Sequence, residues 1–364
     1  MTDIIDWHAL RHAYGPADDL PGLIDRLTDA DAAVRERAVE EAFGSIYHQG
    51  TRYPATVPAV GLLVERLGRE PAATRDLLNL LACIAVGSPV WCVPHGFRAA
   101  SLTTNHGQDE AERACYDAVG RRLPAIIAAC GQLDGGTDTL VLARLLGLFP
   151  AEHHIVCPPL TRMLDSDGHE VRAVATFWLA HVAGRAGRVD LLRDTARRVH
   201  DADPLVADAA ALGLVVAGPS HVTSAAADRV VRLAVGGDVG GTGEWYELGD
   251  LPPRDLAWQC LPLLPPDGRA RAVVADHLRG LPTSEAGWLL AAVFDAAFDE
   301  PAPASLTPAD LTGPQRYPLH LAADVPAHWA AAAMPPYGRV ADMANRLGLP
   351  RDAAGLLRLL GRCP

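Results

Sequence analysis

The stretch TDADAAVRERAVEEA, residues 28–42, returns in altered form as HDADPLVADAAALGL, residues 200–214. Both share the frame Asp-Ala-Asp-x-x-Val, and LDSDGHEVRAVATFWLA at 164–180 repeats the frame with one extra residue. In each copy the Asp pair lies between a Leu-rich stretch and an Ala-rich stretch. Asp at such a junction caps the following helix by accepting its free backbone N–H groups, and its charge suits the helix dipole. The frame therefore predicts helix–turn–helix units whose second helix begins just after the Asp pair.

A second pattern consists of segments in which a proline follows an apolar residue: LPGL at 20, VPAV at 57, LPAI at 123 and CPPL at 157. Proline is favoured in the first turn of a helix, where its missing N–H would be unpaired in any case. These segments therefore predict helix starts at Pro21, Pro58, Pro124 and Pro158, with Pro94 dividing the longest gap.

The composition supports an all-α fold. Of the residues, 49% are hydrophobic but only 5% are aromatic, so the core consists mostly of Ala, Leu and Val. Ala and Leu are strong helix formers, and small side chains let helices approach closely.

Helix pairs of about 30 to 37 residues, joined at an Asp-x-Asp turn followed by Val, Arg and Ala, resemble HEAT or HEAT-like repeats, including the type found in phycobilisome lyase subunits. The segments YHQGTRYPATVPAV, ACYDAVGRRLPAII and LTGPQRYPLHLAAD resemble, in that order, a group of uncharacterised bacterial HEAT-repeat proteins. The resemblance implies an α-solenoid, a superhelix of stacked helix pairs with a concave inner face. It specifies fold more than activity.

The repeat pattern predicts a solenoid over residues 1–235. The Gly-rich stretch VGGDVGGTGEW at 235–245 cannot continue a helix. We expect residues 236–364 to form an irregular helical region that continues and caps the solenoid. Its predicted helices lie at 252–264, 267–281 and 284–298, followed by a Pro-rich connector at 299–318 and a final pair near 319–332 and 338–361.

The charge excludes several function classes. The net charge is −12, and the 32 cationic residues are all Arg. Without Lys the chain has no lysine Schiff base, no pyridoxal-phosphate site of the usual kind and no phosphate-loop lysine. An acidic chain is also a poor general partner for nucleic acid. Its field favours a protein partner with basic patches.

The location expected from the sequence is the cytoplasm of a bacterium. The start MTDIIDWHALRHAYG lacks the basic and apolar regions of a secretory signal, and no uncharged apolar run approaches the length of a membrane span. The seven cysteines are odd in number and scattered, which is typical of core residues in a reducing compartment.

The first candidate site is a polar and aromatic stretch between a helix expected at 33–46 and one expected to begin at Thr56. Long connectors are often functional, and Arg and Tyr are common in binding surfaces. The alternative is a structural turn whose tyrosines close the end of the solenoid. The candidate partner-binding residues here are Tyr47, His48, Gln49, Arg52 and Tyr53.

The second candidate site is the irregular segment SPVWCVPHGFRAASLTTNHGQDE at 88–110. It is either a second partner-binding loop, which would rim the same end of the concave surface, or an ordinary loop with an anchoring Trp. Its candidate residues are Trp91, His95, Arg98 and His106.

Recognised catalytic motifs are absent from the sequence. There is no Gly-x-Ser-x-Gly, His169–Glu170 is followed by VRAV rather than completing His-Glu-x-x-His, and the Gly-rich stretch misses Gly-x-Gly-x-x-Gly. A zinc site from Cys92, His95, Cys157 and a His is a metal alternative. We therefore expect no cofactor, no resident metal and no assigned catalytic residue.

The function expected from these observations is a non-enzymatic binding or scaffold protein, of adaptor or immunity type, that presents its concave face to a protein or peptide. One alternative is an enzyme with an active site built in the groove from His48, Arg52, His95 and His106. Another is a HEAT-like DNA glycosylase, which would need a row of Arg such as Arg185, Arg188 and Arg193. The oligomeric state stays open.

Overall fold

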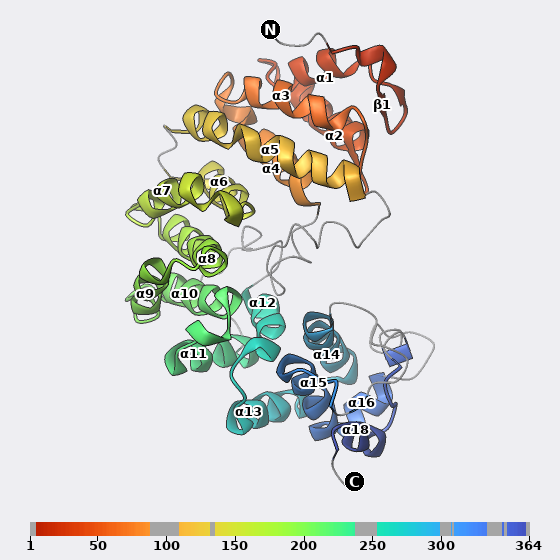
Figure 1. Cartoon of the computed structure of the whole chain (residues 1–364), viewed down its shortest axis with the longest axis vertical. Helices are drawn as coiled ribbons and strands as arrows, with labels where there is room; N and C mark the ends of the chain where they lie inside the picture. The colour runs from red at the N-terminus through yellow and green to blue at the C-terminus, as the bar shows by residue number, and fades with distance from the viewer. Residues whose placement is uncertain are drawn as a thin grey trace. The chain divides into compact units, whose positions relative to one another are not determined.

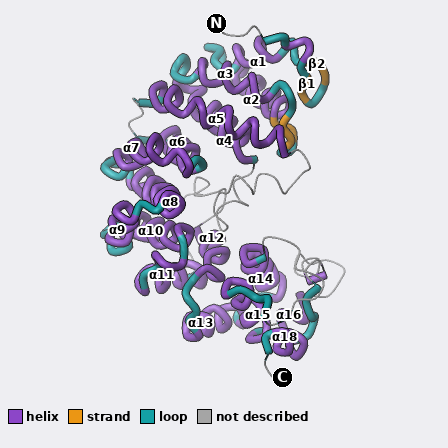
Figure 2. The backbone as a smooth tube through the Cα atoms, viewed as in Figure 1, coloured by secondary structure: helices purple, strands orange, loops and turns teal. Residues whose placement is uncertain are grey.

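The computed structural model describes residues 5–87, 109–131, 135–236, 253–298, 307, 309–332, 344–345 and 348–361. Its described elements are nearly all helices, with two very short β-hairpins near the N-terminus (Figures 1 and 2). The all-α prediction is confirmed. Among the described residues, those up to Leu191 form one compact unit and those from Leu192 onward form a second, and the domain boundary expected near 235 stays a prediction.

In the first unit, successive helices pack against one another and also against helices two positions along the chain, as α1 does with α3 and α4 does with α6. Helix α9 (Val189–Arg198) spans the division between the units. The elements that precede α9 are β1 (Arg11–His12), β2 (Gly15–Pro16), α1 (Leu20–Arg26), α2 (Ala32–Ile46), β3 (Tyr47–His48), β4 (Thr51–Arg52), α3 (Thr56–Arg66), α4 (Thr74–Val86), α5 (Asp109–Ala129), α6 (Thr137–Gly147), α7 (His153–Met163) and α8 (His169–Ala186).

The Asp-x-Asp turns form as predicted in two of the three copies. Asp29, Asp31, Asp201 and Asp203 each accept a hydrogen bond at Oδ1 from the backbone N–H two residues further on, at 2.9–3.0 Å. Asp31 and Asp203 are thereby the N-caps of α2 and of α10 (Pro204–Ala217). The local sequence is sufficient for this result, because the capping side chain and the capped amide are neighbours in the chain.

The third copy departs from the prediction. Its extra residue places Gly168, rather than an Asp, at the N-cap of α8, where no side chain caps the helix. Ser166 Oγ takes the role that Asp29 has in the first copy and accepts from the N–H of Gly168 at 3.2 Å. The cap expected from Asp165 and Asp167 is therefore wrong.

The turns of the copies at 28–42 and 164–180 share a hydrogen-bond pattern made by an Arg in the first turn of the following helix. Arg35 Nη1 donates to the two backbone carbonyls of residues 29 and 30, at 2.6 and 3.0 Å. Arg172 Nη1 donates to the equivalent carbonyls of residues 166 and 167, at 2.8 and 2.9 Å. The Arg that follows Val in these two sequence copies thus binds the turn to the helix that comes after it.

The proline pattern marks helix starts only in part. Pro21 and Pro58 lie in the first turns of α1 and α3, as predicted. Pro124 and Pro158 lie inside α5 and α7, so the helix starts predicted there are wrong. A proline removes one helical hydrogen bond, but packing against neighbouring helices holds these two helices together. Pro94 lies outside the described residues.

The core of the first unit is closed around α8. All its residues from Ala173 to Ala183 are buried, the pattern of a helix enclosed on every side. Helices α6 and α8 approach very closely where Gly147 faces the ring of Trp178. A Cβ at position 147 would lie 2.3 Å from Cε3 of that Trp, so this packing requires glycine.

The second unit contains α10, buried throughout from Leu205 to Val216, and a compact set of further helices. Phe294 stacks on Trp329 with ring centroids 5.1 Å apart, and Trp329 Nε1 donates to the carbonyl of Pro350 at 3.2 Å. The remaining helices are α11 (Ser224–Val235), α12 (Pro253–Cys260), α13 (Gly268–Arg279), α14 (Thr283–Ala297), α15 (Gly313–Asp324), α16 (Pro326–Ala332) and α18 (Ala353–Leu359).

The three helices predicted for this region at 252–298 are confirmed by α12, α13 and α14. The helix expected at 319–332 is instead two helices, and the first begins within the expected connector. Thr312 and Gln315 form a capping box at its start, a local signal that outweighs the Pro-rich composition before it. The Gly-rich stretch from 237 onward lies outside the described residues.

Among the described residues, no single helix has the length and apolar character needed to cross a membrane. Helices α6 and α7, the latter with its preceding 3₁₀ turn, pass that test only as a pair, and this pair is bent by 94°.

Candidate functional site

The first candidate stretch folds as a β-hairpin, not as the irregular connector expected from the sequence. Tyr47 pairs with Arg52 and His48 with Thr51 in antiparallel register. The two-residue turn has positive φ at both positions, 51° at Gln49 and 88° at Gly50. Positive φ at both central residues is the geometry of the type I′ turn that joins twisted strands tightly.

Arg52 anchors this hairpin to the ends of two helices. Its Nη1 donates to Glu112 Oε1 in α5 at 3.0 Å, and its Nε donates to the carbonyl of Ile84 in α4 at 3.2 Å. The same Nη1 lies 3.0 Å from the carbonyl of Gly50 in the turn. Arg52 is only 5% exposed, so the structure gives its guanidinium an internal role. Its contact with a partner stays a prediction.

The tyrosines of the hairpin are partly exposed and held by neighbours. The Arg52 guanidinium lies 5.7 Å from the ring centroid of Tyr47, and Phe43 contacts the same ring edge-on. The backbone N–H of Tyr53 donates to Thr56 Oγ1 at 2.9 Å, and this hydroxyl donates to the carbonyl of Ile46 at 2.8 Å. Thr56 thus ties the two ends of the hairpin together.

A second hairpin, formed by β1 and β2, packs against the first and contributes an exposed Tyr that the sequence analysis does not single out. Tyr14 is 71% exposed, and its hydroxyl lies 3.4 Å from Nδ1 of His48. The backbone ties this hairpin to the segments that flank the first one, since the N–H of Ala13 donates to the carbonyl of Ser45 in α2 at 3.0 Å and the N–H of Ala55 donates to the carbonyl of Arg11 at 3.2 Å. The Gly15–Pro16 pair after this Tyr is the sequence signal for a turn that could have indicated it.

The structure therefore brings together all five residues of the first predicted site, and it adds Tyr14. We call the part of this group that remains accessible the hairpin surface, made of Tyr14, Tyr47, His48, Gln49 and Tyr53. The residues of the second predicted site, Trp91, His95, Arg98 and His106, lie outside the described residues.

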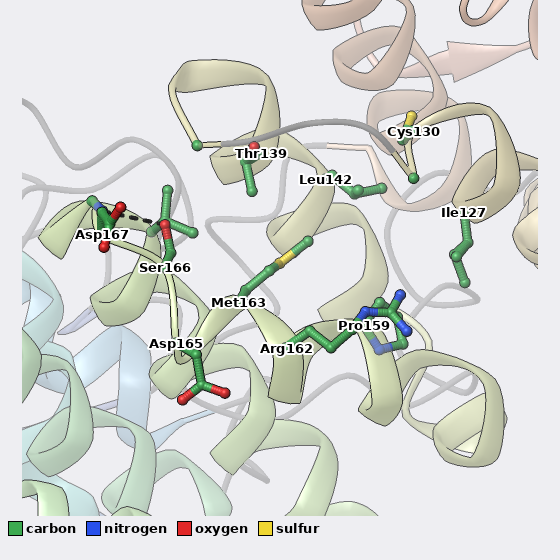
Figure 3. Close-up of a pocket in the computed structure, with 14 residues that line it drawn as sticks. Ile127, Cys130, Thr139, Leu142, Pro159, Arg162, Met163, Asp165, Ser166 and Asp167 are labelled. Carbon is green, nitrogen blue, oxygen red and sulfur yellow. Dashed lines mark hydrogen bonds between the residues drawn. The ribbon is translucent and has the colours of Figure 1, made fainter.

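The second feature that could hold a ligand is a pocket of about 580 Å³ in the first unit (Figure 3). It lies between the end of α5, the start of α6, α7 and the turn before α8. Met163 and Leu142 supply apolar side chains, while Arg162, Asp165 and Asp167 supply charges of both signs. Arg162 is exposed and has no ion pair within the described part of the chain.

The buried cysteines are poor nucleophiles. Burial raises the pKa of Cys115 and of Cys260 to about 12 and that of Cys130 to about 11. Burial also raises the pKa of Cys157. All four are therefore thiols at neutral pH, whereas the nucleophile in cysteine catalysis is the thiolate. The thiols hold apolar positions in the core and do not form a reactive centre.

Only part of the alternative zinc site lies among the described residues. Cys157 is buried, whereas the side chain of His154 is 66% exposed. Within the described ranges, no group of three or more His, Cys, Asp or Glu is placed to hold a metal ion. Cys92 and His95 lie outside those ranges.

The Arg row considered for nucleic acid is partly neutralised. Arg188 donates to both carboxylate oxygens of Asp190, at 2.9 and 2.6 Å. The hydrogen bond from Arg188 lowers the pKa of Asp190 to about 2. A pair held in this way presents little net positive charge to a phosphate backbone.

No protein-family model matches the chain, and no curated protein matches it. Among solved structures, the crystal structure of an engineered protein aligns with 91% of this chain and 88% of that chain, at 15% sequence identity and a TM-score of 0.31. A likeness at this level names no family.

Proposed function

We propose that the chain is a HEAT-like α-solenoid that binds a protein or peptide partner without catalysing a reaction, and that the hairpin surface is its principal contact. The role is of adaptor or immunity type. The observation that carries this proposal is the contact between Tyr14 of one hairpin and His48 of the other, which gathers exposed aromatic and hydrogen-bonding side chains from two parts of the chain.

The helix contacts of the first unit support the solenoid part of the proposal. Helices α1, α3, α5 and α7 form one series of neighbours, and α2, α4, α6 and α8 form another. Two such layers are expected of stacked helix pairs, in which each repeat contacts the repeats next to it. The recurrent turn at 29–30 and 166–167, with its clamping Arg, supports a repeated unit as well.

Burial supports placing the contact at the hairpins and not on α8 or on α10. Helix α8 is buried throughout from Ala173 to Ala183, and α10 from Leu205 to Val216. Side chains within these two stretches have no accessible face to offer a partner. The hairpin surface, in contrast, exposes aromatic groups in a fixed arrangement.

The physical properties of the hairpin surface are those of binding hot spots. Aromatic side chains provide a large contact area with few rotatable bonds, and rigid contacts lose little entropy on binding. Gln49 holds a left-handed conformation that is unfavourable for a residue with a side chain. Strain of this kind is often retained where a side chain must point in a particular direction for function.

A second candidate function, binding of a small molecule, is favoured by the pocket beside Arg162. Its mixed lining fits a ligand with both apolar and charged groups. The groove-enzyme alternative has less support, because His48 is engaged by Tyr14 and Arg52 is internal.

The proposal is tested by affinity capture from native lysate with three tagged proteins: wild type, Gln49→Ala/Tyr53→Ala, and the control Glu65→Ala/Arg69→Ala. The control changes two exposed residues at the end of α3 and beyond it, away from the hairpins. Neither pair of substitutions removes a buried anchor, so all three proteins should melt at the same temperature.

The expected result is a protein retained by wild type and by the control, and lost by the hairpin variant. Equal retention by all three would place the contact elsewhere. Capture of no protein, together with one equivalent of a metal or small molecule in the purified chain, would overturn the scaffold proposal.

A further inference from the structure

Tyr14 is the most exposed of the large hydrophobic side chains in the described part of the chain, yet its ring is fixed. The rings of His12 and His48 meet it edge-on, with centroids 6.2 and 5.7 Å away. Its hydroxyl lies within hydrogen-bond range of His48 Nδ1, and its backbone N–H donates to His12 Nδ1 at 3.1 Å. An aromatic ring that is both open to solvent and held in place is a preorganised platform.

Carboxylates lie beside this platform. Because His12 Nδ1 accepts the N–H of Tyr14, its Nε2 carries the proton and donates to Asp19 Oδ1 at 3.1 Å. This neutral donor leaves the negative charge of Asp19 uncompensated, and its side chain is 65% exposed. The adjacent Asp18 is also exposed, and Nδ1 of His8, itself exposed, lies 3.5 Å from its Oδ1.

The cations near these hairpins do not cancel this charge. Arg52 is paired with Glu112 in the interior, and Arg26 is paired with Glu41 at 2.7 Å. Arg11 is exposed, and it forms no ion pair with Asp18 or Asp19 among the described residues. These two carboxylates therefore have no Arg partner in the described part of the chain.

An open aromatic face flanked by carboxylates is the arrangement that attracts an Arg or Lys side chain, because the ring quadrupole and the carboxylates both stabilise a cation. We propose that Tyr14 is the docking point for a cationic side chain, and that the partner of the hairpin surface presents a basic peptide segment. This inference rests on the proposed function and adds to it the chemical class of the partner.

The test uses two fluorescein-labelled peptides of equal length, a Gly-Arg repeat and a Gly-Glu repeat, with fluorescence anisotropy at low salt. The Gly-Arg peptide should bind wild type, and the Gly-Glu peptide should not. Tyr14→Leu keeps an apolar side chain but removes the ring. It should weaken binding of the Gly-Arg peptide by about two- to five-fold, the range expected for a cation over an exposed ring. Tyr14→Phe keeps the ring and should bind more tightly than Tyr14→Leu.

Two variants with the same change in net charge distinguish attraction by the carboxylates near Tyr14 from attraction by the net charge of the whole protein. Asp18→Asn should weaken binding of the Gly-Arg peptide more than Glu65→Gln, which removes an exposed charge from α3. The inference is overturned if these two variants weaken binding equally, if Tyr14→Leu binds as wild type does, or if the Gly-Glu peptide binds equally well. Such an outcome leaves the lysate capture result intact, so failure of the cationic docking point is distinguishable from failure of the hairpin surface.

Discussion

Arg52 of the β3–β4 hairpin and Glu112 of α5 form an ion pair in which the side chains are 4% and 6% exposed, with Nη1 and Oε1 3.0 Å apart. The two residues are 60 positions apart in the chain. The pair fixes the hairpin, and with it the Tyr and His side chains proposed to bind a partner, to the helical framework.

Removal of one partner of this pair should be costly. Glu112→Leu leaves a buried, uncompensated guanidinium, and the expected loss is about 3–5 kcal/mol of unfolding free energy. Replacing both residues, as Arg52→Met/Glu112→Leu, should cost less than the single change because no isolated charge remains. Urea denaturation monitored by circular dichroism measures the difference.

The matched control is the exposed pair Arg26–Glu41, for which Glu41→Leu should change stability by less than about 1 kcal/mol. If Glu112→Leu and Glu41→Leu had equal effects, Arg52 would not be the anchor of the hairpin.

Burial of His181 should make the protein less stable in mild acid. This side chain is enclosed in α8 with both ring nitrogens unpaired, and desolvation lowers its pKa from 6.5 to about 3. Between these values the unfolded chain binds a proton that the folded chain rejects. The contribution to stability is therefore intact above pH 6.5 and is lost as the pH falls towards 3, at up to about 1.4 kcal/mol per pH unit.

The measurement is urea denaturation of wild type and His181→Leu at pH 7.0 and pH 5.0. Other groups titrate in both proteins, so the informative quantity is the difference between them. Wild type should lose about 2 kcal/mol more than the variant over this interval. Equal losses would show that His181 does not titrate differently in the folded and unfolded chains.

The close approach of α6 and α8 should not tolerate a methyl group at position 147. Gly147→Ala forces a Cβ into the ring of Trp178, and overpacking of this kind costs about 1–3 kcal/mol or more. Gly22→Ala in α1 is the control, because a Cβ there meets nothing within 4 Å. That change should stabilise the protein by up to about 1 kcal/mol through helix propensity. Melting temperatures that shift in the same direction for both variants would contradict this packing.

The turn of the β3–β4 hairpin should gain stability from a residue suited to positive φ. Gln49→Asn creates the Asn-Gly pair preferred in type I′ turns, and an increase of about 0.5–1 kcal/mol is expected. Gly50→Ala places a Cβ at a φ of 88° and should destabilise by about 1–2 kcal/mol. A loss of stability in Gln49→Asn would mean that the Gln side chain makes a contact that outweighs its backbone strain.

The helical architecture was predictable where its cause is local. Asp31 and Asp203 cap the helices that follow them, and capping depends on residues within one turn of each other. Pro124 was misleading because a proline within a helix is tolerated only when tertiary packing supports that helix, and packing is not a local property. The capping box of Thr312 and Gln315 is a local signal for a helix start, but the Pro-rich composition around it indicated a connector.

The candidate site was predictable in its residues but not in its form. Tyr47 to Tyr53 stood out by composition, yet strands of two residues carry little periodic signal. Tyr14 was missed because its role depends on His48, 34 residues away, and on the register of two hairpins. Arg52 looked like a surface residue because its partner Glu112 becomes a neighbour only in the folded chain.

The most direct test of the account is site-specific photo-crosslinking in native lysate, with a benzophenone amino acid at position 49 in the turn or at position 65 on α3. The account predicts a discrete crosslinked protein from position 49, lost when Tyr14 is also changed to Ala, and none from position 65. Crosslinking to the same protein from position 65, with none from position 49, would contradict the assignment of the hairpin surface as the partner-binding site.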